Sequence, residues 1–326
     1  MPDETAPDSP LEAVMGAAVE QATEAFAILG NETRLSILLA LWDAYEPFAE
    51  DNVVPFSELR ERVGMRDSGQ FNYHLDKLTG HFIRKTDDGY ELRRAGHQLV
   101  GTVIGGAGIE EPTLEPTETD GKCNRCGAPT AVTYSDGRLY LVCTDCEGNW
   151  NESDTLPSGA LVGGDFDRAG ITDRPPERMW TAMMAGMRHA AQSGIEGVCE
   201  VCSGQMVTSL DICTEHASDG PCTDCGREWA LAARSRCQVC KNTHAGPPYW
   251  YVAWHPEVVA FYNERGTPIQ YELGDHLDIG GLVGEYEQEL VADDPPRVRV
   301  TYQYDGDRLT LLVDEEMTVL EVTAPD

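Results

Sequence analysis

Hydrophobic and polar positions alternate at helical spacing within residues 68–78. Phe71, Leu75 and Leu78 are spaced by four and three residues, so on a helix they form one apolar stripe that can pack on a core. A second stripe carries polar side chains that can hydrogen-bond to base edges and phosphates. Its members are Gln70, Tyr73, His74 and Lys77. The segment therefore predicts a helix with one buried face and one face suited to a nucleic acid groove.

The segments around this helix predict a small helical unit with a hairpin. A helix over 11–30 ends at Gly30, and Asn31 caps a second helix with an apolar stripe. Ser57 is expected to cap a third helix that Gly64 closes, behind a short edge strand over 53–56. Strands over 82–85 and 89–93 flank a turn sequence, and a last helix covers 95–104. The order of these elements indicates a winged helix-turn-helix.

The rest of the chain predicts a mixture of helices and strands, so the expected fold class is α+β. Strands alternate around 136–137, and residues 178–193 form an amphipathic helix. The C-terminal part predicts strands over 249–254 and 269–273, helices over 256–264 and 276–290, and a hairpin of 298–304 with 309–313.

These patterns divide the chain into seven parts. They are a disordered or early helical segment 1–19, a winged helix-turn-helix 20–104, a linker 105–121, a zinc ribbon 122–150, a connector 151–198, a Cys/His module 199–245 and an α+β domain 246–326.

Cysteine spacing gives the strongest chemical signal. Cys123 and Cys126 form one pair and Cys143 and Cys146 another, joined by the predicted hairpin. Two tight turns that each supply two thiolates can close a tetrahedron around a zinc ion. Four reduced cysteines in so small a hydrophobic segment would rarely be paired in this way, so a zinc ribbon is expected.

A second cluster of four ligand pairs follows. Its members are Cys199 with Cys202, Cys213 with His216, Cys222 with Cys225, and Cys237 with Cys240. Pairing of sequence neighbours puts the first four ligands on one zinc and the last four on another. A crossed pairing and replacement of one ligand by His244 both remain open.

The ligand count supports three structural zinc ions, because eleven cysteines and His216 make twelve ligands. Sites with four protein ligands leave no open position for water, so they stabilise the fold and do not catalyse. An iron-sulfur cluster is the alternative. Two knuckles, meaning tight turns that each supply two ligands, favour a single tetrahedral ion instead.

The net charge of the chain bears on whether its partner can be a nucleic acid. The chain of 326 residues has 56 acidic and 24 basic residues, a net charge of −32, and only four lysines. Such a surface is typical of a protein that works in molar salt, where the Debye length of roughly 3 Å screens repulsion from DNA. Residues 26–105 hold 12 acidic and nine basic side chains and are the least acidic part. A nucleic acid would be tolerated there.

The N-terminus has no basic and apolar leader, and no run of 18 apolar residues occurs. We therefore expect a cytoplasmic protein with no membrane association and with reduced cysteines.

Several exposed side chains are candidates for DNA contact. Gln70 and Asn72 have amides that can pair with adenine, although exposed amides are often only solvated. His74 either contacts a phosphate or packs at the helix crossing. The basic residues at the hairpin either contact phosphates or balance the neighbouring acidic residues. The full candidate set is Ser68, Gln70, Asn72, Tyr73, His74, Lys77, Arg84, Lys85, Arg93 and Arg94.

Two motifs resemble a known family. Residues 27–38, Ala-Ile-Leu-Gly-Asn-Glu-Thr-Arg-Leu-Ser-Ile-Leu, resemble the opening of ArsR-like winged-helix transcriptional regulators, and residues 72–78, Asn-Tyr-His-Leu-Asp-Lys-Leu, resemble their recognition helix. The resemblance covers about 20–104 and implies a homodimer formed through the first and last helices. It also implies a recognition helix, 68–78, in the major groove and a wing, 82–93, beside the backbone. The helix at 57–63 has no cysteine, so the thiolate metal sensor of some members is not expected.

With the Cys/His clusters and the segment 255–262, the chain is similar to haloarchaeal regulators. The expected function is dimeric DNA binding in transcription regulation. One alternative resembles the alpha subunit of transcription factor E, and another is an adaptor that binds proteins through its zinc modules. No enzyme is expected, since no nucleophile-base pair, phosphate loop or open metal site occurs in the sequence.

Overall fold

The computed structural model describes residues 18–106, 112–150, 155–216, 221–269 and 285–324. Two compact units make up the chain, Met1–Glu110 and Glu111–Asp326, and each has its own buried hydrophobic cluster. Both units mix helices and strands, in agreement with the α+β prediction. The boundary lies within the predicted linker. The boundaries expected near 150, 198 and 245 do not separate further compact units.

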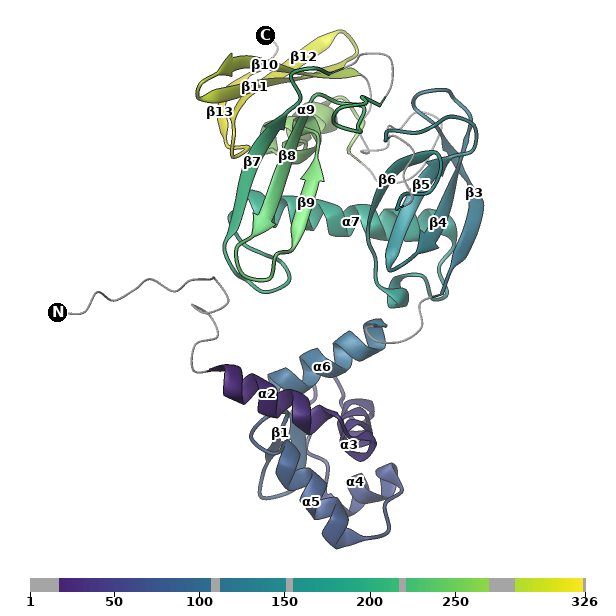
Figure 1. Ribbon diagram of the computed structural model, residues 1–326, viewed down its shortest axis with the longest axis vertical. Coiled ribbons are helices and arrows are strands. Elements are labelled where there is room, and N and C mark those ends of the chain that lie inside the picture. Colours follow the sequence, from purple (N-terminus) through teal and green to yellow (C-terminus); the bar gives the residue numbers. More distant parts are fainter. Residues whose placement is uncertain (1–17, 107–111, 151–154, 217–220, 270–284, 325–326) are drawn as a thin grey trace, which may run out of the picture. The chain divides into compact units, whose positions relative to one another are not determined.

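The first unit packs four helices around α3. Its elements are α2 (Ala18–Leu29), α3 (Glu32–Asp43), α4 (Phe56–Val63), α5 (Ser68–Leu78), β1 (Ile83–Lys85), β2 (Tyr90–Leu92) and α6 (Arg94–Gly105) (Figure 1). Asn31 caps α3 by accepting a hydrogen bond from the Arg34 amide at 3.2 Å, as predicted. Gly64, at φ 72°, closes α4 in the left-handed region. Asp67 caps α5 by accepting from two amides.

Two details of the first unit differ from prediction. Helix α4 begins at Phe56 behind Pro55, so Ser57 lies inside the helix and does not cap it. The reason is that the proline ring already fixes a φ of −59°, which suits a helix start. The edge strand expected over 53–56 is reduced to Val54, which forms an isolated bridge to Tyr90. The predicted residues 11–17 of the first helix lie outside the described residues.

Three antiparallel sheets form the second unit. The first contains β3 (Leu114–Lys122), β4 (Pro129–Ser135), β5 (Arg138–Cys143) and β6 (Ala160–Asp165) in sequence order. The second contains β7 (Met206–Ile212), β8 (Leu231–Cys237) and β9 (Thr243–Gly246), and the third contains β10 (Glu285–Asp293), β11 (Pro296–Tyr304), β12 (Asp307–Asp314) and β13 (Val319–Thr323). The short helix η1 (Arg168–Gly170), α7 (Pro176–Ile195), α8 (Pro248–Tyr251) and α9 (Pro256–Glu264) connect them.

Helix α7 joins the first two sheets, because it contacts strands of both (Figure 1). Its buried face includes Trp180, Met183 and Met184, which belong to one hydrophobic cluster. The same cluster takes in Tyr251 from α8 and Tyr302 from β11. Residues from all three sheets and from α7 and α8 therefore share one core.

Four segments of the second unit correct the sequence predictions. The stretch 249–254 is not a strand, because α8 starts behind Pro247 and covers its first residues. Residues 285–290 belong to β10 and not to a helix. The linker prediction fails over 114–121, which pairs with β4 as the edge strand β3. Residues 160–165 form β6 within the predicted connector. The strand predicted over 269–273 and the first part of the 276–290 helix fall outside the described residues, apart from Ile269, which is not in a strand.

Among the described residues, no single helix has both the length and the apolar character to cross a membrane. The helix pair Thr23–Leu29 and Glu32–Asp43 meets that test only when taken together, with a bend of 86° between them.

Candidate metal centres and nucleic-acid interface

The first site brings together the four cysteines around the β4–β5 hairpin. Its ligands are Cys123, Cys126, Cys143 and Cys146, whose sulfurs lie within 4.8 Å of one another. Cys123 follows β3 and Cys143 ends β5, so the sheet register positions both knuckles. The Cys123 and Cys146 sulfurs are 3.7 Å apart and those of Cys126 and Cys143 are 3.4 Å apart.

The second site has the same construction at one end of the β7–β9 sheet. Its ligands are Cys199, Cys202, Cys237 and Cys240. The sulfurs of Cys199 and Cys240 are 3.6 Å apart, and those of Cys202 and Cys237 are 3.5 Å apart. Met206 pairs with Cys237 in the β7–β8 ladder, and this register brings the knuckle before β7 to the knuckle after β8.

The third site lies in the loop that joins β7 to β8. Its ligands are Cys213, His216, Cys222 and Cys225. The His216 Nδ1 atom is 3.5 Å from the Cys225 sulfur, and its Nε2 atom is 3.1 Å from the backbone oxygen of Glu228. Nδ1 therefore faces the ligand group, and Nε2 faces a carbonyl that can accept its proton. A hydrogen bond of this kind fixes the tautomer and orientation of a metal-binding histidine.

The pairing of sequence neighbours in the second cluster is wrong. The outer two pairs form the second site and the inner two form the third site. The cause is the antiparallel ladder of β7 and β8, which pairs Met206 with Cys237 and so brings together the ligand turns before β7 and after β8. The observed grouping is nested, so it is neither the pairing of neighbours nor the crossed pairing that the spacing left open. His244 belongs to none of the three groups, since its Nε2 atom lies 2.7 Å from a Glu200 carboxylate oxygen.

Backbone amides prepare one thiol of each four-cysteine site to ionise. Burial opposes ionisation of Cys143, but amide donors from Cys146 and Asp145 and neighbouring thiols lower its pKa to about 7. Burial likewise opposes ionisation of Cys237, whose amide donors lower its pKa to about 6. The pKa of Cys146 is raised to about 12, first by burial and then by hydrogen bonds with its thiol neighbours. In each four-cysteine site, backbone donors therefore favour ionisation of one thiol.

No disulfide joins any of the eleven cysteines, all of which lie in described segments. Sulfur separations of 3.4 to 3.7 Å are far longer than the ~2.05 Å of a disulfide bond. Each of the three groups could hold a metal ion.

Helix α5 has two faces of different chemistry, as predicted. Phe71, Leu75 and Leu78 are fully buried in the core of the first unit. The polar candidates on the exposed face are Ser68, Gln70, Asn72, Tyr73 and Lys77. The sequence did not predict one feature of this face, a hydrogen bond that the Asn72 amide donates to the Asp76 carboxylate at 3.0 Å.

His74 is not on the exposed face. It is 8 % exposed, so the structure favours the packing alternative over phosphate contact. Burial and then the charge of Arg34 lower its pKa. The imidazole is therefore enclosed, and its surroundings disfavour the charged form.

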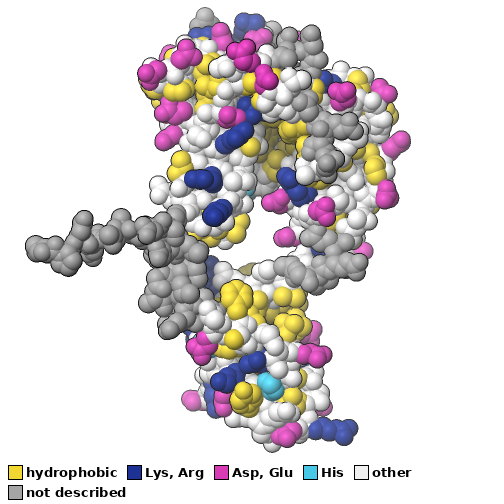
Figure 2. All heavy atoms as spheres, viewed as in Figure 1, with side chains coloured by type: hydrophobic (Ala, Val, Ile, Leu, Met, Phe, Trp, Pro, Cys, Tyr) yellow, Lys and Arg dark blue, Asp and Glu magenta, His cyan; other side chains and the backbone are white. Residues whose placement is uncertain are grey.

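Basic side chains gather beside β1 (Figure 2). Arg84, Lys85, Arg93 and Arg94 are all exposed. Arg84 forms an ion pair of 2.5 Å with Glu91, in agreement with the charge-balancing alternative for that residue. Lys85 lies over the Tyr90 ring, with 5.9 Å between its Nζ atom and the ring centroid.

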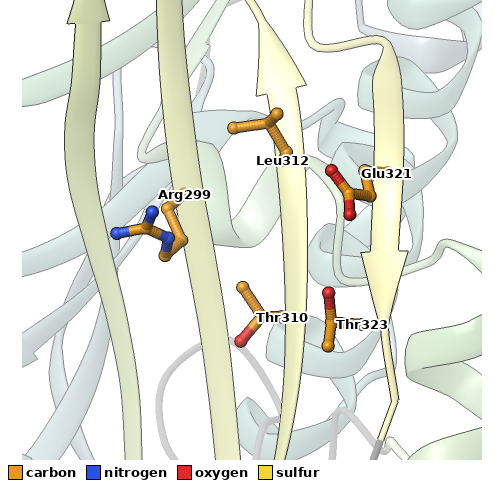
Figure 3. Close-up of a pocket in the computed structure, with 5 residues that line it drawn as sticks. All are labelled: Arg299, Thr310, Leu312, Glu321 and Thr323. Carbon is orange, nitrogen blue, oxygen red and sulfur yellow. The ribbon is translucent and has the colours of Figure 1, made fainter.

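A shallow hollow of about 180 Å³ lies on one face of the third sheet. Figure 3 shows its five side chains projecting from β11, β12 and β13. Arg299 lies opposite Leu312, which lies opposite Glu321, so the hollow follows the strand register. Arg299 is also paired with Glu289 at 2.8 Å. The hollow is separate from the three groups of metal-binding side chains.

The fold and these groups define a cysteine-rich α+β protein with three possible metal centres. Its second unit belongs to the family described as a domain of unknown function, DUF7351, whose family model matches residues 120–319. A second family model, for the domain of unknown function DUF7347, matches residues 22–103. The two matches fall on either side of the boundary between the compact units. No curated protein matches the sequence.

Proposed function

We propose that this protein is a dimeric, DNA-binding transcriptional regulator in which three zinc ions stabilise the second unit. The first unit would be a winged helix-turn-helix resembling the ArsR-like regulators, with α4 and α5 as the helix-turn-helix and β1–β2 as the wing. The observation that carries this proposal is the division of α5 into a buried apolar face and an exposed face with amide, phenol and ammonium groups.

The order of elements supports the same assignment. Helix α5 follows α4 after a short turn, and the hairpin of β1 and β2 follows α5 directly. Exposed cations on the hairpin suit contact with phosphates, which position a protein on DNA, whereas the α5 side chains would read bases. Gln70, Tyr73 and Lys77 would make the base contacts, since the Asn72 amide already donates to Asp76.

Exposed apolar side chains support the dimer. Phe26 on α2 is 76 % exposed and Ile104 on α6 is 43 % exposed. Figure 2 shows hydrophobic side chains over α6. Large apolar side chains in one area of a surface mark association sites. A second copy that packs on α2 and α6 would cover them and would place two α5 helices on successive half-sites.

Zinc is the metal that fits the three groups best. A tetrahedral zinc with bonds of about 2.3 Å to sulfur needs sulfur atoms about 3.8 Å apart, and about 3.6 Å between sulfur and nitrogen. The observed separations of 3.4 to 3.7 Å between sulfurs and 3.5 Å between Cys225 and His216 agree with this geometry. Four protein ligands fill the shell, so the ion would have a structural role.

DNA binding is tested by footprinting across a genome and by binding measurements in molar KCl. We expect discrete bound sites, and loss of most specific affinity in the Gln70→Ala, Lys77→Ala double variant. The control is Asn263→Ala, an exposed amide on α9 of the second unit, which should bind as the wild type does. Absence of bound sites, or normal binding by the double variant, would support a protein-binding adaptor instead.

A further inference from the structure

Glu228 lies between two metal sites that are far apart in the sequence. Its backbone oxygen is the acceptor for the Nε2 atom of His216, the nitrogen ligand of the third site. Its carboxylate accepts a hydrogen bond from Arg125, with 2.7 Å between Oε2 and Nη1. Arg125 is one of the two residues between the first-site ligands Cys123 and Cys126. One residue therefore contacts the ligand loop of each site.

The backbone reinforces this connection. The Glu228 amide donates to the Asn149 oxygen at 2.9 Å, three residues after the first-site ligand Cys146. Arg125 also donates to the backbone oxygen of Gly148, next to Asn149. Asn149 is itself 8 % exposed and bonded through its side chain to the Leu161 oxygen at 2.8 Å. The contact is thus anchored in the first sheet.

Residues on both sides of Glu228 extend the junction. Arg227 forms a β-bridge with Trp150, and the rings of Trp150 and Trp229 pack edge to face with 5.5 Å between centroids. The Arg227 side chain is buried and donates to the Asp211 carboxylate at 2.7 Å, which ties the junction to β7. A shift of the third-site loop would disturb this whole set of contacts.

The second site lies at the opposite end of the same strands. Cys213 of the third site follows Ile212, which pairs with Leu231, whereas Cys237 of the second site pairs with Met206. The ladder between these two ends consists of seven residue pairs, which corresponds to roughly 20 Å of strand. The second site is closest to the third in sequence but is remote from the Glu228 junction.

We propose that Glu228 and Arg125 are positioning residues that couple metal binding at the first and third sites, and that the second site binds its metal independently. The physical reason is that an ordered first-site knuckle holds Arg125 and Asn149 in place, and these hold the Glu228 carbonyl that orients His216. Loading of either site then lowers the conformational cost of loading the other, and the effect must be reciprocal. This inference rests on the metal binding proposed above.

The test uses the full chain titrated with Co²⁺, whose visible spectrum separates the third site from the two four-cysteine sites because imidazole is a stronger-field ligand than thiolate. Cys126→Ser and Cys202→Ser are matched variants, since each removes an exposed second cysteine of a knuckle, in the first and the second site respectively. We expect Cys126→Ser to weaken Co²⁺ binding at the third site by about tenfold. Cys202→Ser should change it by less than about twofold. Equal effects of the two variants, or no effect of either, would overturn the coupling.

A second set of variants avoids any change to the ligands. Glu228→Gln and Arg125→Gln should each weaken the effect of the first site on the third, and Arg125→Lys, which keeps the charge, should restore part of it. Glu289→Gln is the control, because it breaks an ion pair of the same type with Arg299 on the third sheet. Coupling that is unchanged in Glu228→Gln would contradict the role of this side chain. A wild-type chain that binds three ions without coupling refutes this inference alone, whereas one that binds no metal refutes the metal proposal as well.

Discussion

Val54 and Tyr90 exchange both backbone hydrogen bonds, with 2.8 Å from the Val54 nitrogen to the Tyr90 oxygen and 2.9 Å in the opposite direction. This bridge fastens the segment before α4 to the β1–β2 hairpin. Because α4 follows directly and α5 comes next along the chain, the position of the hairpin is linked to that of the proposed helix-turn-helix.

Gly89→Ala tests the importance of this bridge. A Cβ atom at Gly89 would lie 2.2 Å from the Val54 backbone oxygen, so the hairpin or the preceding segment must move. We expect a loss of about 1–3 kcal/mol in the free energy of unfolding, measured by denaturant titration. Gly101→Ala on α6 is the matched control, because a Cβ there meets nothing within 4 Å. It should be neutral or slightly stabilising. Equal stabilities of the two variants would contradict the close approach.

His74 should remain neutral at pH 7. Burial and Arg34 both disfavour the imidazolium, so the folded pKa lies below 6.5. For a histidine with a lowered pKa, the unfolded state binds the proton more readily, and stability is therefore lost as pH falls below 6.5 toward the folded pKa. The slope between the two values is at most about 1.4 kcal/mol per pH unit.

Nuclear magnetic resonance titration of the His74 ring measures this pKa directly. Arg34→Gln should raise it, because the charge is removed while burial stays. The same titration in denaturant should return the unperturbed value. A folded pKa of 6.5 or above would show that the ring is not enclosed as described.

The dimer proposal predicts that Phe26→Glu produces a monomer. A carboxylate on the exposed part of α2 would have to be buried without a partner when a second copy packs there, which costs several kcal/mol. Phe48→Glu is the matched control, since Phe48 is also an exposed phenylalanine but lies in the loop after α3 and not on α2 or α6. Light scattering at defined protein concentration distinguishes the two results. If the Phe26→Glu protein is still a dimer, this face of α2 is not the dimer interface.

How much the sequence predicts depends on the range of the interactions that determine each feature. Helix α5 and the hairpin of β11 and β12 depend on periodicity and turn chemistry within a dozen residues, and the sequence predicts both correctly. The three groups that could hold a metal ion are made of the twelve side chains singled out by their spacing, because a tight turn with two such side chains is a local motif. These features need no knowledge of the rest of the chain.

Features determined by distant contacts were missed. The grouping of the ligands depends on the β7–β8 register, which pairs residues 19 or more apart across a loop without clear periodicity. Strand β3 has almost no apolar residues and exists because its backbone pairs with β4 at a sheet edge. The sequence around Glu228 does not indicate its contacts with two metal sites, since a charged residue beside a ligand is usually solvated. The alternation in β10, exposed Glu285, Glu287 and Glu289 between less exposed residues, was a usable signal of period two.

Removal of metal should unfold the second unit and spare the first. All three groups of ligands lie within Glu111–Asp326, and two of them are built into sheets that share the core with α7. Without the ions, the thiolates of each group repel one another or take up protons, and the binding free energy that stabilises the fold is lost. Protons compete for the same ligands. Protonation removes the thiolate form of ligands such as Cys143 and Cys237, so acid should release metal as a chelator does. Hydrogen exchange measured with and without a chelator should show loss of protection in β4, β5, β7 and β8, while α3 and α5 stay protected. Loss of protection in α3 and α5 to the same degree would mean that the first unit depends on the metal too.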